Sequence, residues 1–304
     1  MNSKRSLVDW STFGLLSLLW ASAYAFNRMA VSKGAPELGF PPQLVILGRL
    51  SIAAVVLLII VALTRQKWPA FSDRKSWLAM AAMGLLGCAI PFYLIAAAQK
   101  TVDSSLAALY VSASPLFVSI MAHFIFHDER ISTRKVIGLL IGFGGVTVLF
   151  GPEAFAAFGS SSVIAQAMCL FATSMYAAST IIARYARDIP PFVFSAGFLT
   201  IGTLLSLPLL VTVDISALAP SSTAMFGIVG LALGPTALAS ILYMVLVART
   251  SATFLSLTGY VIPILSAIIG FFAFQEMQSP RAVLAFAMIL GGVWLAQRAS
   301  LPRG

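Results

Sequence analysis

Ten long apolar segments, separated by short connections, dominate the sequence. A stretch of about 18 or more residues with few charges is typical of a transmembrane helix. The predicted spans are 12–32, 43–64, 77–98, 104–126, 135–150, 161–183, 192–213, 223–248, 253–274 and 281–297. The connections contain helix-breaking residues, as in Gly34-Ala35-Pro36 and Gly151-Pro152, and none is long enough to hold a soluble domain. The pattern predicts an all-α, polytopic membrane protein.

Composition supports the membrane assignment, and the distribution of charge predicts the orientation of the chain in the membrane. The 304-residue chain is 60% hydrophobic and 10% charged, whereas soluble domains carry about 25% charged residues, so an ordinary soluble enzyme is excluded. With the N-terminus inside, 14 of the 19 Lys and Arg residues lie on the inner side, three lie outside and two lie within spans. Because positive loops stay in the cytoplasm, we expect a bacterial cytoplasmic membrane protein with both termini inside, the bilayer as its partner and no nucleic acid.

The two halves of the chain carry matching features in the same order. The matched pairs are Pro41-Pro42 with Pro190-Pro191, Tyr24 with Tyr176, Pro91 with Pro235, Pro115 with Pro263, Glu129 with Glu276, and Gly144-Gly145 with Gly291-Gly292. Five spans per half is an odd number, so the second half enters the membrane inverted relative to the first. We therefore predict two inverted five-helix repeats, residues 1–151 and 152–304, around a central cavity, which is an architecture of secondary transporters.

Four of the matched residues are prolines near the centres of their spans. Proline removes a backbone donor and frees a carbonyl in the preceding turn, so it kinks or interrupts a helix. Interrupted spans at corresponding places in two repeats indicate the substrate site and its hinges. The predicted hinge residues are Pro91, Pro115, Pro235 and Pro263.

Polar and aromatic side chains cluster on the proline-containing spans and on spans one and six. Hydroxyls, amides and aromatic rings with polar tips suit a small amphipathic or zwitterionic solute. The predicted substrate-binding residues are Trp20, Ser22, Tyr24, Asn27, Tyr93, Tyr110, Ser114, Tyr176, Ser240, Tyr243 and Tyr260. Any single Ser or Thr can instead bond its own helix backbone.

Two arginines, Arg28 and Arg49, lie within spans, and their role stays open at this point. All ten acidic residues fall in loops or at span ends, so each arginine needs water, an aromatic face or an anionic ligand. Each lies one to two turns from the outer end of its span and could snorkel to the interface. Alternatively, the two form an anion clamp, and the protein then carries anionic or phosphorylated metabolites.

The sequence predicts no metal, no cofactor and no catalysis. Cys88 and Cys169 lie within spans and indicate packing. His123 and His127 share one helix face but lack acidic or thiol partners for a metal, and G-x-S-x-G and H-E-x-x-H are absent. Without a carboxylate at depth, facilitated rather than proton-coupled transport is expected, unless His123 or an acid at a span end supplies a proton site.

Spans five and ten differ from the others because they carry small residues and almost no polar ones. Gly138, Gly142 and Gly144-Gly145 lie in span five, and Ala287 with Gly291-Gly292 lies in span ten. Small residues let helix backbones approach closely. These spans are therefore predicted to be scaffold helices or a homodimer contact.

The chain resembles the drug/metabolite transporter superfamily, specifically its EamA-type branch. The similarity covers the whole chain and is carried by Leu19 to Tyr24, by Gly48-Arg49-Leu50, and by the run from Glu129 to Gly145 with its copy from Glu276 to Gly292. Ala21 and Ala23 depart from the Gly and Asn that are frequent in the family pattern. Within the branch, the chain looks most like YddG-type exporters of aromatic and other amino acids. The resemblance implies a helical basket that exports amino acids, including aromatic and neutral ones, by alternating access.

Overall fold

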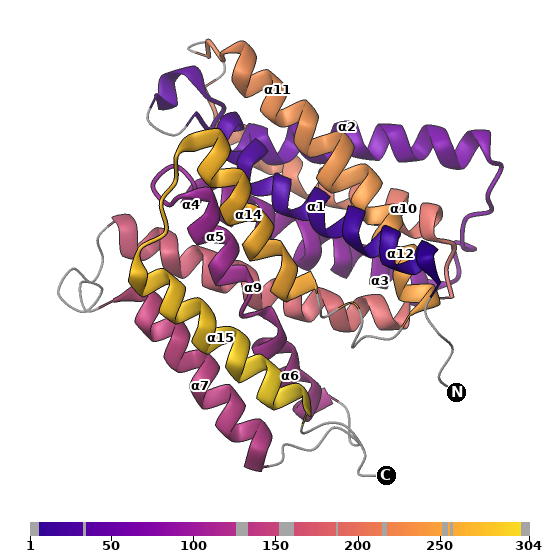
Figure 1. Ribbon diagram of the computed structural model, residues 1–304. Coiled ribbons are helices and arrows are strands. Elements are labelled where there is room, and N and C mark those ends of the chain that lie inside the picture. The colour runs from indigo at the N-terminus through magenta and orange to yellow at the C-terminus, as the bar shows by residue number, and fades with distance from the viewer. Residues whose placement is uncertain are drawn as a thin grey trace.

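The computed structural model describes residues 6–32, 35–125, 133–151, 161–186, 188–214, 218–250, 255 and 258–298, which form helices joined by short connections (Figure 1). The N-terminal half contains α1 (Leu7–Ala30), η1 (Pro36–Leu38), α2 (Pro42–Leu63), α3 (Arg74–Met83), η2 (Gly84–Ala89), α4 (Ile90–Ala98), α5 (Ser104–Val111), α6 (Ser114–Ile125) and α7 (Thr133–Phe150). The C-terminal half contains α9 (Ser161–Tyr185), α10 (Pro191–Ser206), η3 (Leu207–Thr212), α11 (Ser222–Leu231), η4 (Ala232–Leu238), α12 (Ala239–Arg249), α14 (Thr258–Phe274) and α15 (Pro280–Arg298).

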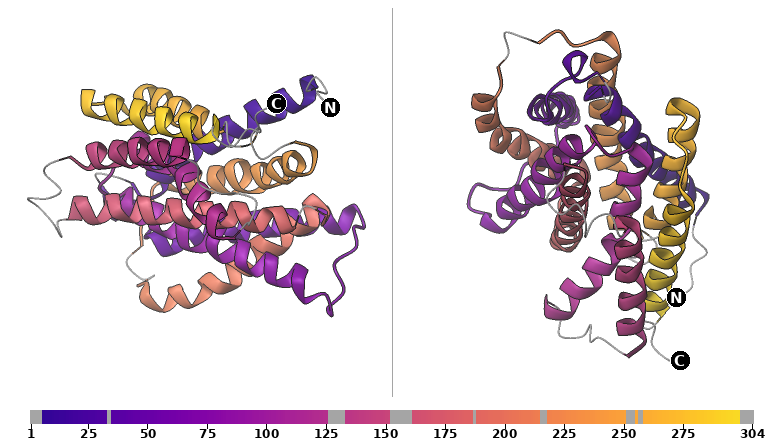
Figure 2. Two further views of the ribbon diagram at one scale, coloured as in Figure 1. Left: turned by 90° about the horizontal axis from the view of Figure 1, so that it is seen from below. Right: turned by 90° about the vertical axis from the view of Figure 1, so that its left-hand side faces the viewer.

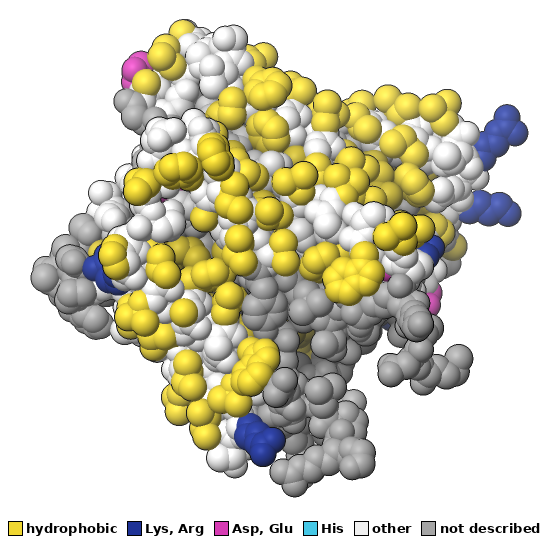
Figure 3. Space-filling model, in the orientation of Figure 1, with side chains coloured by type: hydrophobic (Ala, Val, Ile, Leu, Met, Phe, Trp, Pro, Cys, Tyr) yellow, Lys and Arg dark blue, Asp and Glu magenta, His cyan; other side chains and the backbone are white. Residues whose placement is uncertain are grey.

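Six helical stretches are long and apolar enough to cross a membrane within the described residues. They are Pro42–Leu63, Arg74–Ala98, Ser104–Ile125, Ser161–Ala183, Pro191–Thr212 and Ser222–Arg249, and two shorter apolar helices are Val261–Phe274 and Pro280–Leu295. Large apolar side chains such as Leu140, Phe226 and Phe272 are exposed on the surface, where hydrophobic groups cover much of the face in Figure 3. The membrane class is confirmed, and the number of ten spans stays a prediction.

The helices pack in corresponding pairs from the two halves. Helix α2 packs against α10, and α7 packs along α15. Helix α1 contacts α11 and α14, and α9 contacts α4 and α6. Figures 1 and 2 show α7 and α15 side by side in each view. This arrangement brings the polar spans of each half against the interrupted spans of the other half.

Two spans contain π-helical segments at the positions of the matched prolines. In the first half, η2 ends just before Pro91. In the second half, η4 contains Pro235. The other two predicted hinge prolines differ from this pair: Pro115 lies at the start of α6, directly after α5 ends, and Pro263 lies inside the continuous helix α14. Since π-bulges often lie at functional sites, the Pro91 and Pro235 regions are candidates for the site.

Glycines hold α7 and α15 in close contact, as the small-residue pattern indicates. A Cβ on Gly292 would lie 2.5 Å from the Gly138 carbonyl oxygen and 2.5 Å from the Gly142 nitrogen. The glycine face of span ten is therefore used within the chain. A Cβ on the neighbouring Gly291 would meet nothing within 4 Å.

These two glycines provide a matched test of the contact. We expect Gly292→Ala to lower the free energy of unfolding by about 1–3 kcal/mol, because the rigid backbone of α7 must move away. Gly291→Ala should be neutral or slightly stabilising, since alanine favours helix. Thermal unfolding of the two variants in detergent measures the difference, and equal midpoints would contradict the close contact.

Candidate functional site

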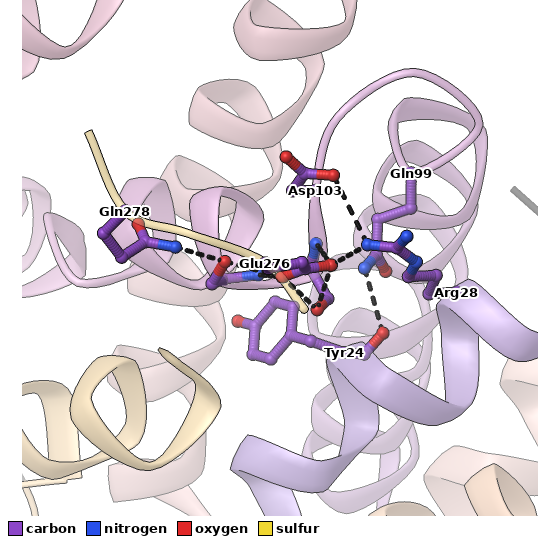
Figure 4. Close-up of polar contacts among 8 residues, drawn as sticks. Tyr24, Arg28, Gln99, Asp103, Glu276 and Gln278 are labelled. Atoms are coloured by element: carbon purple, nitrogen blue, oxygen red, sulfur yellow. Dashed lines mark hydrogen bonds and ion pairs between the residues drawn. The ribbon is translucent and has the colours of Figure 1, made fainter. Parts of the chain in front are cut away.

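A buried carboxylate, Glu276, joins three segments at the outer ends of the helices under the predicted orientation. Glu276 follows the end of α14 and is only 6% exposed. It forms an ion pair with Arg28 of α1 (Figure 4). It also accepts hydrogen bonds from the backbone nitrogens of Ser104 and Ser105, each at 3.0 Å, at the start of α5. The carboxylate thereby satisfies free N–H groups at a helix N-terminus.

Side chains complete this group, which we call the Glu276 cluster: Arg28, Asp103, Ser104, Ser105, Glu276 and Gln278. The hydroxyls of Ser104 and Ser105 donate to Glu276 at 2.8 and 2.6 Å. Gln278 donates to the Ser105 hydroxyl at 2.6 Å. Burial raises the pKa of the Glu276 carboxyl, but the hydrogen bonds from Ser105 and Ser104 outweigh it and leave the pKa below its ordinary value. Glu276 is therefore ionised at neutral pH.

Arg28 is held on several sides within the chain. Besides Glu276, it contacts the half-exposed Asp103 carboxylate at 3.4 Å. Its guanidinium carbon lies 4.5 Å from the centre of the Phe274 ring. Arg28 is thus paired with carboxylates of the same chain, and its role in snorkelling or in anion binding stays a prediction. The sequence pattern paired Glu276 with Glu129 but placed both in loops, so this buried partner was missed.

An amide pair lies beside the Glu276 cluster and links α1 to the loop after α4. Asn27 donates to the Gln99 side-chain oxygen at 2.5 Å, and Gln99 donates to the backbone oxygen of Tyr24 at 2.9 Å. Both amides are almost fully buried. Asn27, predicted to bind substrate, is thus engaged in a helix contact here. Together the amide pair and the Glu276 cluster join α1, the loop after α4, the start of α5 and the segment after α14 at this end of the bundle.

A second buried group surrounds Arg49 in the interior, and we call it the Arg49 cluster: Tyr24, Arg49, Phe92, Tyr176 and Thr236. Arg49 is only 7% exposed, so it does not snorkel to the surface of the bundle. Its Nε donates to the Thr236 hydroxyl at 2.5 Å, and its guanidinium carbon lies 3.5 Å from the centre of the Phe92 ring. Tyr24 and Tyr176 lie near enough to interact with it electrostatically. The cluster therefore combines residues of α1, α2, α4, α9 and η4.

The remaining predicted substrate residues are distributed over several places. Trp20 packs against Tyr243, with ring centres 5.5 Å apart, and Tyr93 and Tyr243 both border the core that includes α2 and α10. Tyr110 is fully buried and donates to Gln166, and the Ser22 hydroxyl bonds the Leu19 carbonyl of its own helix. Ser114 and Ser240 are half-buried, and the side chain of Tyr260 lies outside the described residues. The structure thus groups Tyr24 and Tyr176 around Arg49 but not Tyr110.

At the opposite end of the bundle, an ion pair joins the two halves. Arg249, at the end of α12, donates to Asp9 of α1 at 3.0 Å. The Arg249 side chain is 51% exposed, so this pair is accessible to water. Glu129, the repeat partner of Glu276, lies outside the described residues, as does His127. No group of three metal-ligating side chains occurs in the described part of the chain.

Comparisons with known proteins agree on one family. The model of the EamA-like transporter family matches residues 11–151 and 163–297. The chain is 28% identical over 294 residues to the "Uncharacterized transporter YdfC" of Bacillus subtilis, covering 95% of this chain and 91% of that one. It is 25% identical over 302 residues to a "Probable terminal-alkyne amino-acid exporter" of Streptantibioticus cattleyicolor, covering 99% and 96%.

A solved crystal structure shows the same fold. It superposes with a TM-score of 0.65 at 22% identity, over 97% of this chain and 99% of that chain. The family match covers most of both halves, and the apolar helices are those of a membrane protein. The chain therefore belongs to the EamA-like transporter family of the drug/metabolite transporter superfamily and is a multi-pass membrane transporter.

Proposed function

We propose that this transporter exports small amphipathic solutes, namely amino acids including aromatic and neutral ones, across the bacterial cytoplasmic membrane by alternating access. The observation that carries the proposal is the pair of π-helical segments, η2 beside Pro91 and η4 around Pro235, one in each half. Such breaks let the two ends of a span change direction separately. Both breaks adjoin the Arg49 cluster, so bending at either one would alter the site.

The closed outer end supports the alternating-access part of the proposal. The Glu276 cluster ties α1, the start of α5 and the segment after α14 together, and the amide pair adds the loop after α4. Release of a solute to the outside requires these contacts to separate. In the proposed cycle the Glu276 cluster serves as the outer gate, and its contacts hold in the state that is closed to the outside.

The amino-acid part of the proposal rests on the lining of the Arg49 cluster and on one relative. The Phe92 ring stacks on the buried Arg49 cation and packs against Tyr176, and Tyr24 lies near enough to interact with the cation electrostatically; such a group suits solutes that combine charge with apolar groups. The Streptantibioticus cattleyicolor relative is named as an amino-acid exporter. Facilitated transport remains our expectation, and Glu276 is the acid at a span end that a proton-coupled mechanism would use.

The two-repeat organisation and the orientation belong to the same proposal. Two separate matches to one family model, the paired helix contacts and the paired π-helical segments support inverted repeats at 1–151 and 152–304 around a central cavity. The excess of Lys and Arg on one side supports cytoplasmic termini. The homodimer through spans five and ten also stays a prediction.

The alternative function is a carrier of anionic or phosphorylated metabolites, and the pairing of Arg28 argues against it. It requires Arg28 and Arg49 to act together as an anion clamp. Arg28 is instead paired with Glu276, whose side chain is 2% exposed. A doubly charged phosphate would then face a single buried arginine, which favours a solute with one carboxylate.

Uptake into proteoliposomes tests the proposed function. The purified protein is reconstituted, its orientation is checked, and labelled threonine, methionine and phenylalanine are followed with and without an imposed pH gradient. We expect saturable uptake that does not depend on the gradient. Uptake that requires the gradient would replace the facilitated mechanism with a proton-coupled one, and absence of uptake under both conditions would overturn amino-acid export.

A further inference from the structure

Arg49 is a buried cation whose contacts in the described residues are all neutral. Its Nε donates to Thr236, and its guanidinium stacks on Phe92, while no carboxylate of the described chain contacts it. A buried charge without a counter-ion is costly. The guanidinium has five N–H donors and uses one on Thr236, so a fork of donors remains for a planar anion.

The two contacts of Arg49 both lie at the helix breaks. Phe92 directly follows Pro91 in the first turn of α4, just after η2 ends, and Thr236 directly follows Pro235 inside η4. The two residues come from different halves of the chain, and Arg49 of α2 touches both. A movement of the guanidinium therefore changes contacts beside both π-helical segments.

The contact with Thr236 is part of a chain of hydrogen bonds at the second break. Pro235 has no N–H, so it cannot donate a hydrogen bond to the carbonyl of Leu231, four residues earlier. The Thr236 hydroxyl donates to this carbonyl at 2.7 Å and accepts from Arg49 at 2.5 Å. Arg49 thereby fixes the hydroxyl that closes the π-helical turn.

We propose that Arg49 binds the carboxylate of the transported amino acid and that this binding weakens its bond to Thr236, so that η4 is freed to change shape. The inference rests on the proposed transport function and names the group of the substrate that the site recognises. A carboxylate matches the planar fork of a single arginine and its single charge. The rings of Tyr24, Phe92 and Tyr176 then face the rest of the solute.

Ligand chemistry tests the first part in the unmodified protein. Unlabelled phenylalanine and phenylalaninamide compete with labelled phenylalanine for uptake into proteoliposomes. Loss of the carboxylate removes a charge-assisted bidentate interaction, so we expect the amide to compete about 10- to 100-fold more weakly. Equal competition by the amide would overturn the inference while leaving amino-acid transport intact. Absence of labelled uptake would instead overturn the proposed function and the inference with it.

Variants of Arg49 and Thr236 separate binding from coupling. Arg49→Gln should raise KM for phenylalanine about 10-fold or more and remove the preference over the amide, with Arg49→Lys intermediate because it keeps the charge but loses the fork. Thr236→Val should lower KM, because Arg49 then has no bond to Thr236 to weaken when it binds the carboxylate, and should lower Vmax several-fold, because binding no longer acts on η4; Thr236→Ser, which keeps the hydroxyl, should restore both.

The inference can be tested even if Arg49→Gln does not fold. If Arg49→Gln gives no monodisperse protein, the amide comparison and the Thr236 pair still decide the inference. An Arg49→Gln protein that folds and keeps the wild-type preference for phenylalanine over its amide would overturn carboxylate binding at this residue. Equal Vmax for the Val and Ser variants of Thr236 would overturn the coupling.

Discussion

Glu276→Gln should lower the free energy of unfolding by about 3–5 kcal/mol, because it removes the buried carboxylate of the Arg28 ion pair and leaves Arg28 only the longer contact with the half-exposed Asp103. The Glu276 side chain is 2% exposed and bonds Arg28 together with the backbone and hydroxyls of Ser104 and Ser105. A neutral amide cannot satisfy all these donors. Denaturation in a mild detergent, followed by fluorescence, measures the loss, and we also expect the variant to leak solute because its outer gate is weakened.

Asp103→Asn is the matched control for this variant. Asp103 contacts the same guanidinium, but at 3.4 Å and with a side chain that is 48% exposed. Exposed ion pairs contribute about 0–1 kcal/mol, so this variant should unfold almost like the wild type. Equal losses for the two variants would argue against a special role of Glu276 in closing the outer end.

The same carboxylate predicts how stability depends on pH. Hydrogen bonds from Ser104 and Ser105 leave the folded-state pKa of Glu276 below its ordinary value of 4.5. Its contribution to stability is therefore fully present above pH 4.5 and is lost as pH falls through the lower, folded-state pKa. We expect the stability difference between wild type and Glu276→Gln to be constant from neutral pH to about 5 and to shrink below it. A difference that grows on acidification would contradict this assignment.

The double variant Pro91→Ala/Pro235→Ala should lower the transport rate about 10-fold or more while leaving the protein at least as stable as the wild type. Proline in a helix interior costs about 3 kcal/mol relative to alanine, so the substitution favours straight helices over the π-helical turns. A rise of about 1.4 kcal/mol in the barrier to bending suffices for a tenfold slower cycle. Initial rates of phenylalanine uptake and thermal unfolding midpoints measure the two effects.

Pro263→Ala provides the control because the structure separates this proline from the other two. Pro263 lies inside the continuous helix α14, and no π-helical segment accompanies it there. We expect a transport rate within about twofold of the wild type, a barrier change well below 1 kcal/mol. Should the Pro263 variant be slowed as much as the double variant, the role of the π-helical segments as hinges would be refuted.

The sequence by itself determined the class of the protein and much of its internal pattern. Long apolar segments predict membrane helices because lipid leaves the backbone no other way to satisfy its polar groups. The small residues of spans five and ten indicated close packing, and Gly292 against Gly138 confirms it. The matched prolines Pro91 and Pro235 marked the places where the structure has π-helical turns. These features are local, so they can be read along the chain.

Only the tertiary structure decided which charges meet. Arg28 and Glu276 are 248 residues apart. The local sequence pattern of neither segment predicts that the end of α14 contacts α1. From sequence alone, a glutamate after a span is expected to be a solvated loop residue, but helix packing buries Glu276. Arg49 and Thr236 are likewise joined only because α2 lies against η4. Apolar periodicity fixes which residues are helical, whereas the pairing of helices fixes which polar groups lose water and must find each other.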